Sequence, residues 1–290
     1  MQKYKYNDNI AGAAADHDAG ALWPYRLITA VLRQLLDQYQ DRFTLETNTP
    51  AQSIDHIDGA EYPYAIVTPR GVIRAKTVIH CTNGFAAHLL PNLVGRLYPL
   101  RGTMSAQQPG PSFPNLGSSV SWSYLGKPSF DQTTGVFSTG LYYAQQNART
   151  GAIFIGGESQ KLSDMLSSDD TVIATEAHET LSRILSRVYN KDAQPVGEQR
   201  LWSGIMGFTS DGLPLVGRLT KDLTARAGDG EWIAAGFNGH GMDKCWLTGE
   251  AVAEMIMGRT PEAFPKAFLV SEERCEKMGP DQALAMFMGL

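Results

Sequence analysis

The chain has 290 residues, of which 43% are hydrophobic and 19% charged, so it can bury a large core in one long domain or two smaller ones. Its net charge of −5 and the lack of a basic block argue against nucleic acid as a partner. No apolar run reaches the roughly 20 residues of a membrane span, and no apolar signal core opens the chain. We therefore expect a cytoplasmic protein.

The N-terminal part of the chain is predicted to hold one helix and several short strands. After a polar, irregular stretch to about residue 20, apolar residues recur at helical spacing from Leu27 to Tyr39, with Pro24 at the opening. Runs typical of strands follow at 43–47, 64–68 and 72–74. The apolar run 77–82 is typical of a strand buried on both faces, and it ends in Asn83-Gly84.

In the rest of the chain, a block of predicted strands is followed by predicted helices and strands. Strands of an antiparallel sheet are predicted at 119–125, 136–145 and 152–157, with Gly and Pro between them. A helix over 171–189, strands at 202–208 and 232–236, and a helix over 243–257 come next. The tail beyond Gly258 contains three prolines, and we expect it to be peripheral. Together these segments predict a discontinuous α/β domain interrupted by a sheet domain.

The sequence indicates neither a metal site nor a hydrolase nucleophile. The three cysteines, Cys81, Cys245 and Cys275, lie far apart and are expected to be buried free thiols. The histidines show no ligand spacing, so no metal site is expected. Neither a GxSxG elbow nor a Walker loop occurs.

The most informative segment is the glycine-rich turn Gly236-Phe-Asn-Gly-His-Gly-Met242, which lies between a predicted strand and a predicted helix. Glycines allow a backbone to approach a ligand closely, and a helix start offers free N–H groups and a positive dipole end. Such a turn suits a carbonyl, a phosphate or the edge of a flavin ring. Two further segments, 78–84 and 201–217, indicate a functional site only weakly when each is taken alone.

Together and in this order, the motifs resemble the FAD-dependent oxidoreductases of the D-amino-acid oxidase type, above all the glutamylputrescine-oxidase-like branch of fungi and bacteria. The motifs that carry the likeness are, in chain order, Trp23-Pro24 with Leu27, Cys81-Thr82-Asn83-Gly84, Pro99-Leu-Arg-Gly102, Trp202-x-Gly204 with Thr209-x-Asp211-x-x-Pro214-x-x-Gly217, and Gly236 to Met242. They span about residues 20 to 258. Each motif is modest, but the ordered set is specific.

The resemblance implies a mixed α/β (α+β) fold with FAD as cofactor and a small molecule as substrate. A remnant of an FAD-binding Rossmann-like domain would comprise residues 1–96 and 202–290, and an antiparallel-sheet substrate domain residues 97–201. Near the diphosphate or ribitol would lie Thr82, Asn83 and Gly84, while the isoalloxazine would be lined by Gly236, Asn238, Gly239, His240, Gly241 and Met242. Candidates for contact with the substrate are Arg101, Tyr142, Tyr143 and Trp202, although core packing is an equal alternative for the aromatic residues.

The sequence departs from the family pattern in two ways. Amino-acid oxidases of this type often place an arginine two residues after the Gly of Trp-x-Gly, where it can clamp a carboxylate, and here that position is Met206. This disfavours an α-amino-acid substrate, because a buried carboxylate needs a paired cation. The family's N-terminal βαβ unit with its glycine fingerprint is also absent from these residues. We therefore expect an exposed sheet edge that a partner chain or oligomer could cover.

Three functional hypotheses follow. The first is a truncated amine-oxidase-type flavoenzyme that passes a hydride from a C–N bond to flavin, with oxygen as acceptor and no recognisable general base. The second is a flavin-free descendant acting as a cyclase, an isomerase or a binder, with His240, Tyr142, Tyr143 and Asp211 as polar candidates. The third is an inactive fragment whose exposed apolar faces would make it unstable.

Overall fold

The computed structural model describes residues 20–157, 159–189 and 193–283. Its helices are α1 (Pro24–Gln38), α2 (Leu162–Met165), α3 (Thr175–Ser182), α4 (Ile184–Val188), α5 (Lys221–Thr224), α6 (Cys245–Ile256) and α7 (Glu272–Lys277). The described residues also form the 3-10 helices η2 (Asn83–His88), η3 (Pro91–Leu93) and η4 (Lys266–Phe268). The irregular stretch expected before residue 20 lies outside the described residues.

The strands fall into four sheets among these residues. They are β1 (Ser53–His56), β2 (Tyr64–Thr68), β3 (Gly71–Ala75), β4 (Val78–His80), β5 (Leu97–Gln108), β6 (Ser121–Leu125), β7 (Ser129–Asp131), β8 (Val136–Ser138), β9 (Leu141–Gln146), β10 (Ile153–Gly156), β11 (Ser159–Lys161), β12 (Val196–Thr209), β13 (Leu215–Arg218) and β14 (Glu231–Ala235). The strand orders are β1-β2-β3, β12-β5-β10-β9-β6, β11-β8-β7 and β13-β14-β4. This arrangement confirms the predicted mixed α/β fold.

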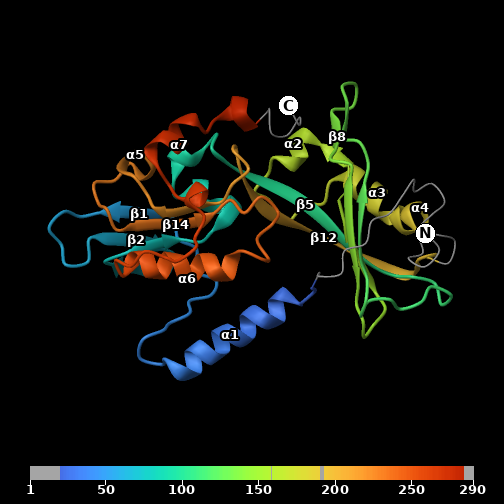
Figure 1. The fold of residues 1–290 in the computed structure, drawn as a ribbon, viewed down its shortest axis with the longest axis horizontal. Helices are drawn as coiled ribbons and strands as arrows, with labels where there is room; N and C mark the ends of the chain where they lie inside the picture. Colours follow the sequence, from blue (N-terminus) through green and yellow to red (C-terminus); the bar gives the residue numbers. More distant parts are fainter. Residues whose placement is uncertain (1–19, 158, 190–192, 284–290) are drawn as a thin grey trace.

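Two long antiparallel strands, β5 and β12, connect the two halves of the molecule (Figure 1). At one end they lie beside the β13-β14-β4 sheet, and at the other they form part of the five-stranded sheet. In the smaller sheet, β14 pairs with β4 in parallel and with β13 in antiparallel fashion. The two strands therefore extend from one half of the chain into the other.

Each half has its own hydrophobic cluster. One face of the five-stranded sheet packs against α3 and α4, and the buried residues there include Trp122, Ile153, Ile155, Leu181 and Tyr189. The second cluster lies between the β13-β14-β4 sheet and the segments around η3, α5 and α7, and it includes Leu93, Leu97, Leu215, Ile233 and Met278. The opposite side of this smaller sheet is covered by α6.

The structure corrects several predicted elements. No strand forms at 43–47, and β1 at 53–56 pairs with β2 instead. The predicted helix 171–189 is two shorter helices, α3 and α4, that begin at Thr175. The predicted strand 77–82 is limited to β4, which is not buried on both faces, because β4 lies at the edge of its sheet and Ile79 is 48% exposed.

Two expectations about burial are also wrong. The tail beyond Gly258 is not peripheral, because Cys275 and Met278 belong to the second cluster and the Val270 N–H donates to the Val216 carbonyl. Cys81 and Cys245 are exposed, so of the three free thiols Cys275 alone is buried. Sequence periodicity could not show either result, since both depend on which surfaces the tail and the neighbouring elements cover.

Helix α1 forms as predicted but does not enter a core. Pro24 occupies its first turn, where the missing N–H costs nothing. None of its residues is buried, and it lies at the margin of the molecule, outside the sheets (Figure 1). Several of its apolar side chains, among them Leu27 and Ile28, are exposed.

Candidate functional site

Three segments that are far apart in the sequence meet at the end of β12. Asn83 adopts a left-handed conformation with φ +46°, and its Oδ1 accepts a hydrogen bond of 2.9 Å from the Gly236 N–H. Gly207 lies beneath this amide, because a Cβ on Gly207 would stand 2.4 Å from Asn83 Oδ1. Gly84 is equally confined, since its Cβ would stand 2.7 Å from the Met206 carbonyl oxygen. A side chain at either glycine would push the segments apart.

Asn238 completes this junction. Its N–H donates to the Gly207 carbonyl at 2.8 Å, and its Oδ1 accepts from the Thr209 N–H at 2.9 Å. Its Nδ2 donates to the Gly236 carbonyl at 2.6 Å, which holds the turn closed. Asn238 itself has φ +53°, a conformation that asparagine tolerates better than most residues. The glycine-rich turn is thus fixed to β12 by side-chain and main-chain hydrogen bonds.

The predicted cofactor residues divide into two groups by exposure. Gly84 and Gly236 are buried and Asn83 and Asn238 half-buried, and the two asparagine side chains bond within the chain. The other group is exposed or half-buried and is made up of Thr82, Gly239, His240, Gly241 and Met242. The first group therefore holds the turn, and the second group is the part that a ligand could reach.

The helix start differs from the prediction. Helix α6 begins at Cys245 rather than near residue 243, and the N–H groups of Lys244 and Cys245 both donate to the Gly241 carbonyl. The chain thus uses two of the N–H groups that were expected to be free for a ligand. Lys244 Nζ also donates to the His240 carbonyl at 3.1 Å, which ties the turn to the helix start.

These residues fit the ring end of a flavin. Gly239 is exposed with φ +78°, and a Cβ there would have Phe208 as its nearest neighbour at 3.6 Å, so the turn presents backbone at this position. A flat ring can approach such a backbone closely. Holding the pyrophosphate of FAD takes a glycine loop at a helix start, and no GxGxxG occurs in these 290 residues.

Three of the predicted substrate residues share one face of the five-stranded sheet. Directly opposed residues of antiparallel strands point to the same side, and Trp202, Met104, Gly156 and Tyr143 form one such row. Met206 lies four residues beyond Trp202 on β12 and keeps that side. Trp202 is 42% and Tyr143 38% exposed. We call this side of the sheet, away from α3 and α4, the open face.

Arg101 and Tyr142 lie on the other side of the sheet. Tyr142 is opposite Tyr124 and packs against the first cluster. Arg101 is 4% exposed; its NH1 donates to the Asp169 carbonyl at 3.1 Å, and its NH2 lies 3.6 Å from Asp164 Oδ1. Arg101 thus ties β5 to the segment around α2. The structure does not bring these two residues together with Tyr143, Trp202 and Met206.

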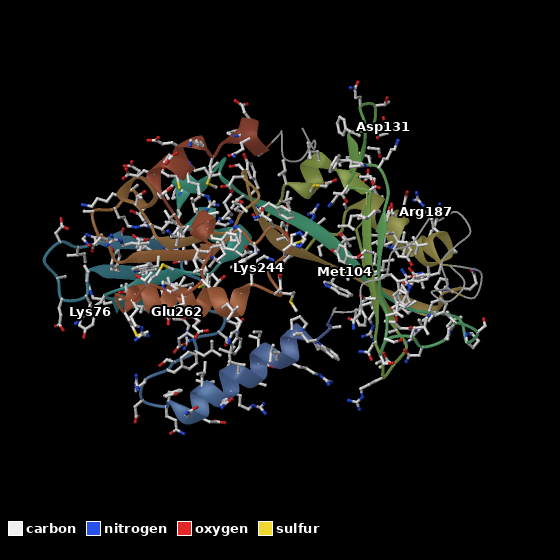
Figure 2. The ribbon with its side chains drawn as sticks, viewed as in Figure 1. Lys76, Met104, Asp131, Arg187, Lys244 and Glu262 are labelled. Atoms are coloured by element: carbon white, nitrogen blue, oxygen red, sulfur yellow. The ribbon has the colours of Figure 1, made fainter. Side chains whose placement is uncertain are left out.

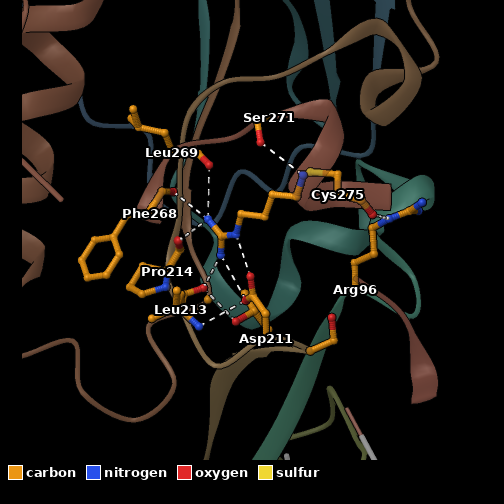
Figure 3. A network of polar contacts seen from close by, with 12 residues as sticks. Arg96, Asp211, Leu213, Pro214, Phe268, Leu269, Ser271 and Cys275 are labelled. Carbon is orange, nitrogen blue, oxygen red and sulfur yellow. Dashed lines mark hydrogen bonds and ion pairs between the residues drawn. The ribbon is translucent and has the colours of Figure 1, made fainter. Parts of the chain in front are cut away.

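Asp211, a polar candidate from the sequence, is held by an arginine that the sequence did not indicate. Arg274 of α7 contacts both carboxylate oxygens of Asp211, at 2.6 and 3.1 Å, and donates to the carbonyls of Leu213, Pro214 and Phe268 (Figure 3). Burial opposes charge on Asp211, but the hydrogen bonds and attraction of Arg274 outweigh it and hold the Asp211 pKa below its usual value. Asp211 therefore serves to fix the tail.

A second buried charge network was also missed by sequence reasoning. Glu231 at the start of β14 accepts from Arg226 Nε at 2.6 Å and lies 2.9 Å from His80 Nε2 on β4. Burial opposes charge on Glu231, but Arg226 and His80 outweigh it and lower the Glu231 pKa. The network joins β4 to β14 just before β4 leads to Thr82. No motif marks it, because its three members are ordinary residues until the fold brings them together.

Residues 2–255 match the sequence profile of the FAD dependent oxidoreductases of the DAO type. The chain belongs to this family. No curated protein matches the chain.

Solved structures with the same fold include three oxidases. The glycine oxidase of Geobacillus kaustophilus has a TM-score of 0.56 and 20% identity, and the match covers 79% of this chain and 53% of that one. The iminodiacetate oxidase of Chelativorans sp. BNC1 has a TM-score of 0.57 and 18% identity, covering 84% and 57%. NikD, an amino acid oxidase essential for nikkomycin biosynthesis, has a TM-score of 0.59 and 18% identity, covering 83% and 59%. The chain therefore spans just over half the length of these solved structures.

No helix of the described residues has the length and apolarity needed to cross a bilayer.

Proposed function

We propose that this chain carries the ring-binding and substrate-binding part of an amine-oxidising flavoenzyme of the glutamylputrescine-oxidase-like branch. FAD, when bound, would accept a hydride from the carbon of a substrate C–N bond, and oxygen would reoxidise it. The observation that carries the proposal is the junction of Asn83, Gly207 and Gly236. It joins the three family motifs at one place, beside the start of the open face.

The chain's own residues would bind and orient the reactants. Thr82 and the exposed part of the turn, Gly239 to Met242, would hold the flavin, and the positive end of α6 would favour negative charge on the ring. Trp202 and Tyr143 would form walls for the substrate. Met206 in place of the carboxylate-clamping arginine supports an amine rather than an α-amino acid as substrate.

The diphosphate of FAD would need a further segment or chain. The edge of the β13-β14-β4 sheet at β4 is unpaired among the described residues, and Ile79 on it is 48% exposed. A strand added there would pair the free main-chain groups of β4 and cover this side chain. We propose that the pyrophosphate-binding part docks at this edge, either from the same polypeptide or from a partner.

A flavin-free binding protein is the second candidate. It is favoured by one observation: the N–H groups of Lys244 and Cys245 both donate to the Gly241 carbonyl and are not free for a flavin. In that case the open face would bind a small molecule without redox chemistry.

A titration with FAD separates the two functions. We expect the visible spectrum of FAD to change on addition of the full 290-residue chain, and His240→Ala to weaken FAD binding several-fold because His240 is an exposed residue of the turn. His178→Ala on α3 is the matched control, since His178 is an exposed histidine on the far side of the five-stranded sheet, and it should leave binding unchanged. Because the chain is proposed to hold the ring end alone, riboflavin, which carries the ring without the diphosphate, is titrated beside FAD. A stable chain that leaves the spectra of both FAD and riboflavin unaltered would contradict the flavoenzyme proposal.

A further inference from the structure

Two of the three free thiols lie at the same end of the β13-β14-β4 sheet. Cys81 directly follows β4, and Cys245 is the first residue of α6. Because β4 pairs with β14 in parallel and α6 follows β14 through the glycine-rich turn, the end of β4 and the start of α6 lie at one end of this sheet. Figure 2 shows Lys76, which precedes β4, at the opposite end of this half of the molecule from Lys244, which precedes α6. Strand β4 therefore runs toward the start of α6.

The alternation of side chains along β4 turns Cys81 toward α6. His80 contacts Glu231 on the side of the sheet where Ile233 enters the second cluster. Successive residues of a strand point to opposite sides, so Cys81 lies on the other side, which α6 covers. Exposure follows the same alternation, since Ile79 is exposed, His80 is buried and Cys81 is exposed. The Cys81 thiol is therefore on the α6 side of the sheet and open to solvent.

The two thiols also affect each other electrostatically. Partial burial raises the pKa of Cys81, and the negative charge of an ionised Cys245 raises this pKa further. Because a Coulomb interaction weakens with distance, the two sulfurs lie near one another. The Cys245 Sγ lies against the glycine-rich turn, 3.1 Å from where a Cβ on Gly241 would stand. The thiol pair is therefore at the exposed end of the candidate cofactor site.

We propose that Cys81 and Cys245 form a reversible disulfide that ties the end of β4 to the start of α6, with hydrogen peroxide as the oxidant. Peroxide oxidises one thiolate to a sulfenic acid and releases hydroxide. The second thiolate then attacks the sulfenic sulfur, which forms the S–S bond and releases a second hydroxide. With the two protons that the thiols gave up, the products are one disulfide and two waters. A small thiol reverses the bond by thiol–disulfide exchange.

The bond joins the two segments of the candidate cofactor site covalently. Cys81 is followed by Thr82, and Cys245 comes shortly after Met242, the last residue of the turn. The disulfide closes a long loop of the chain, so it restrains the unfolded state and stabilises the fold. In the proposed function, oxygen that reoxidises the flavin leaves as hydrogen peroxide, so the oxidant forms beside the pair. This source of peroxide rests on the proposed function, whereas the thiol pair does not.

Peptide mapping of the full 290-residue chain, without added flavin, tests this proposal. The reduced protein is treated with a small excess of hydrogen peroxide at about pH 8.5, because the thiolate is the reacting form. It is then unfolded in iodoacetamide and digested with trypsin. We expect most chains to contain peptide 77–96, with Cys81, linked to peptide 245–259, with Cys245. Dithiothreitol should release both peptides. Cys275 is the internal control, because its thiol is buried in the second cluster and should be alkylated as a free thiol.

Stability gives a second readout. The peroxide-treated chain should unfold at a higher urea concentration than the reduced chain, whereas peroxide should leave the midpoints of Cys81→Ser and Cys245→Ser unchanged. Cys81 and Cys245 that stay free or are oxidised singly in the treated chain, or a disulfide that joins two chains, would overturn the proposal. Because the assay contains no flavin, that result leaves the flavoenzyme proposal standing, and a chain that ignores flavin can still form the disulfide.

Discussion

At the scale of single residues, close packing rather than charge defines the candidate site. The side-chain amides of Asn83 and Asn238 form hydrogen bonds within the chain, and these bonds hold one turn against β12. The glycines at 84 and 207 are needed because a Cβ at either would collide with main chain of the neighbouring segment. The site can therefore be tested by adding a single methyl group.

Gly207→Ala should destabilise the protein by about 1–3 kcal/mol, since the new Cβ would stand 2.4 Å from Asn83 Oδ1 and 2.7 Å from the Gly84 nitrogen. Gly249→Ala in α6 is the control, because a Cβ there meets nothing within 4 Å and a helix interior gains up to about 1 kcal/mol from the exchange. Urea unfolding midpoints give both values. Equal midpoints for the two variants would contradict the close packing at Gly207.

The Asp211–Arg274 pair makes a prediction about pH. Asp211→Asn should lower the free energy of unfolding by about 1.5–3 kcal/mol at neutral pH, because Arg274 loses its charged hydrogen-bond partner. The folded Asp211 pKa is lowered, so this stabilisation is present above the ordinary carboxyl pKa of about 3.9 and is lost as pH falls through the folded value. Denaturation from pH 7 to pH 3 should therefore show the two proteins converging in acid.

Glu46→Gln serves as the control for this pair. Glu46 contacts Arg70 through two exposed side chains, and such surface pairs contribute about 0–1 kcal/mol. If Asp211→Asn lowers the free energy of unfolding by no more than Glu46→Gln does, the Asp211–Arg274 pair does not stabilise the fold.

At the scale of elements, sequence periodicity located most segments but not their interruptions. The predicted helix 171–189 breaks at Arg183, and side chains from two strands satisfy carbonyls in the last turn of α3. Gln107 Nε2 donates to the Leu181 carbonyl at 2.7 Å, and Gln199 Nε2 donates to the Ser182 carbonyl at 3.2 Å. These contacts join residues far apart in the chain, so no local pattern could reveal them.

In the candidate site too, the sequence indicates residues that lie in motifs but not positions that depend on strand pairing. Trp202, Tyr143 and Met206 could be proposed from motifs and residue type, and register places them on one face. Tyr142 and Tyr143 looked equivalent in sequence, but alternation along β9 sends them to opposite faces. Arg274 lies in no motif, and its position becomes informative when tail docking is known.

The docking of the tail makes a prediction for α7. Met278 follows this helix and is buried in the second cluster, so Met278→Ala should cost about 2–5 kcal/mol. Met257→Ala at the end of α6 removes the same side chain from an exposed position and should change stability by no more than about 0.5 kcal/mol. Thermal unfolding of the two variants measures the difference, and a peripheral tail would give two equal values.

At the scale of the whole molecule, β5 and β12 are the two paired strands that connect the two halves. They pass from the second cluster, which contains Leu97, to the open face, so the proposed flavin and substrate sites share two rigid strands. Sites built on strands hold their geometry better than sites on loops. By contrast, α1 and the edge at β4 contribute little to either cluster.

The position of α1 leads to a prediction about its stability. It has 15 residues, none of them buried, and isolated helices of this length are marginal in water. We expect its amides to exchange with deuterium through an opening of about 0–1 kcal/mol, far faster than those of β14, which lies between two paired strands. Mass spectrometry of peptides from 24–38 and 231–235 measures both. Protection of α1 comparable to that of β14 would mean that another surface covers its apolar side chains. Protection that rises with protein concentration would identify that surface as a second copy of the chain.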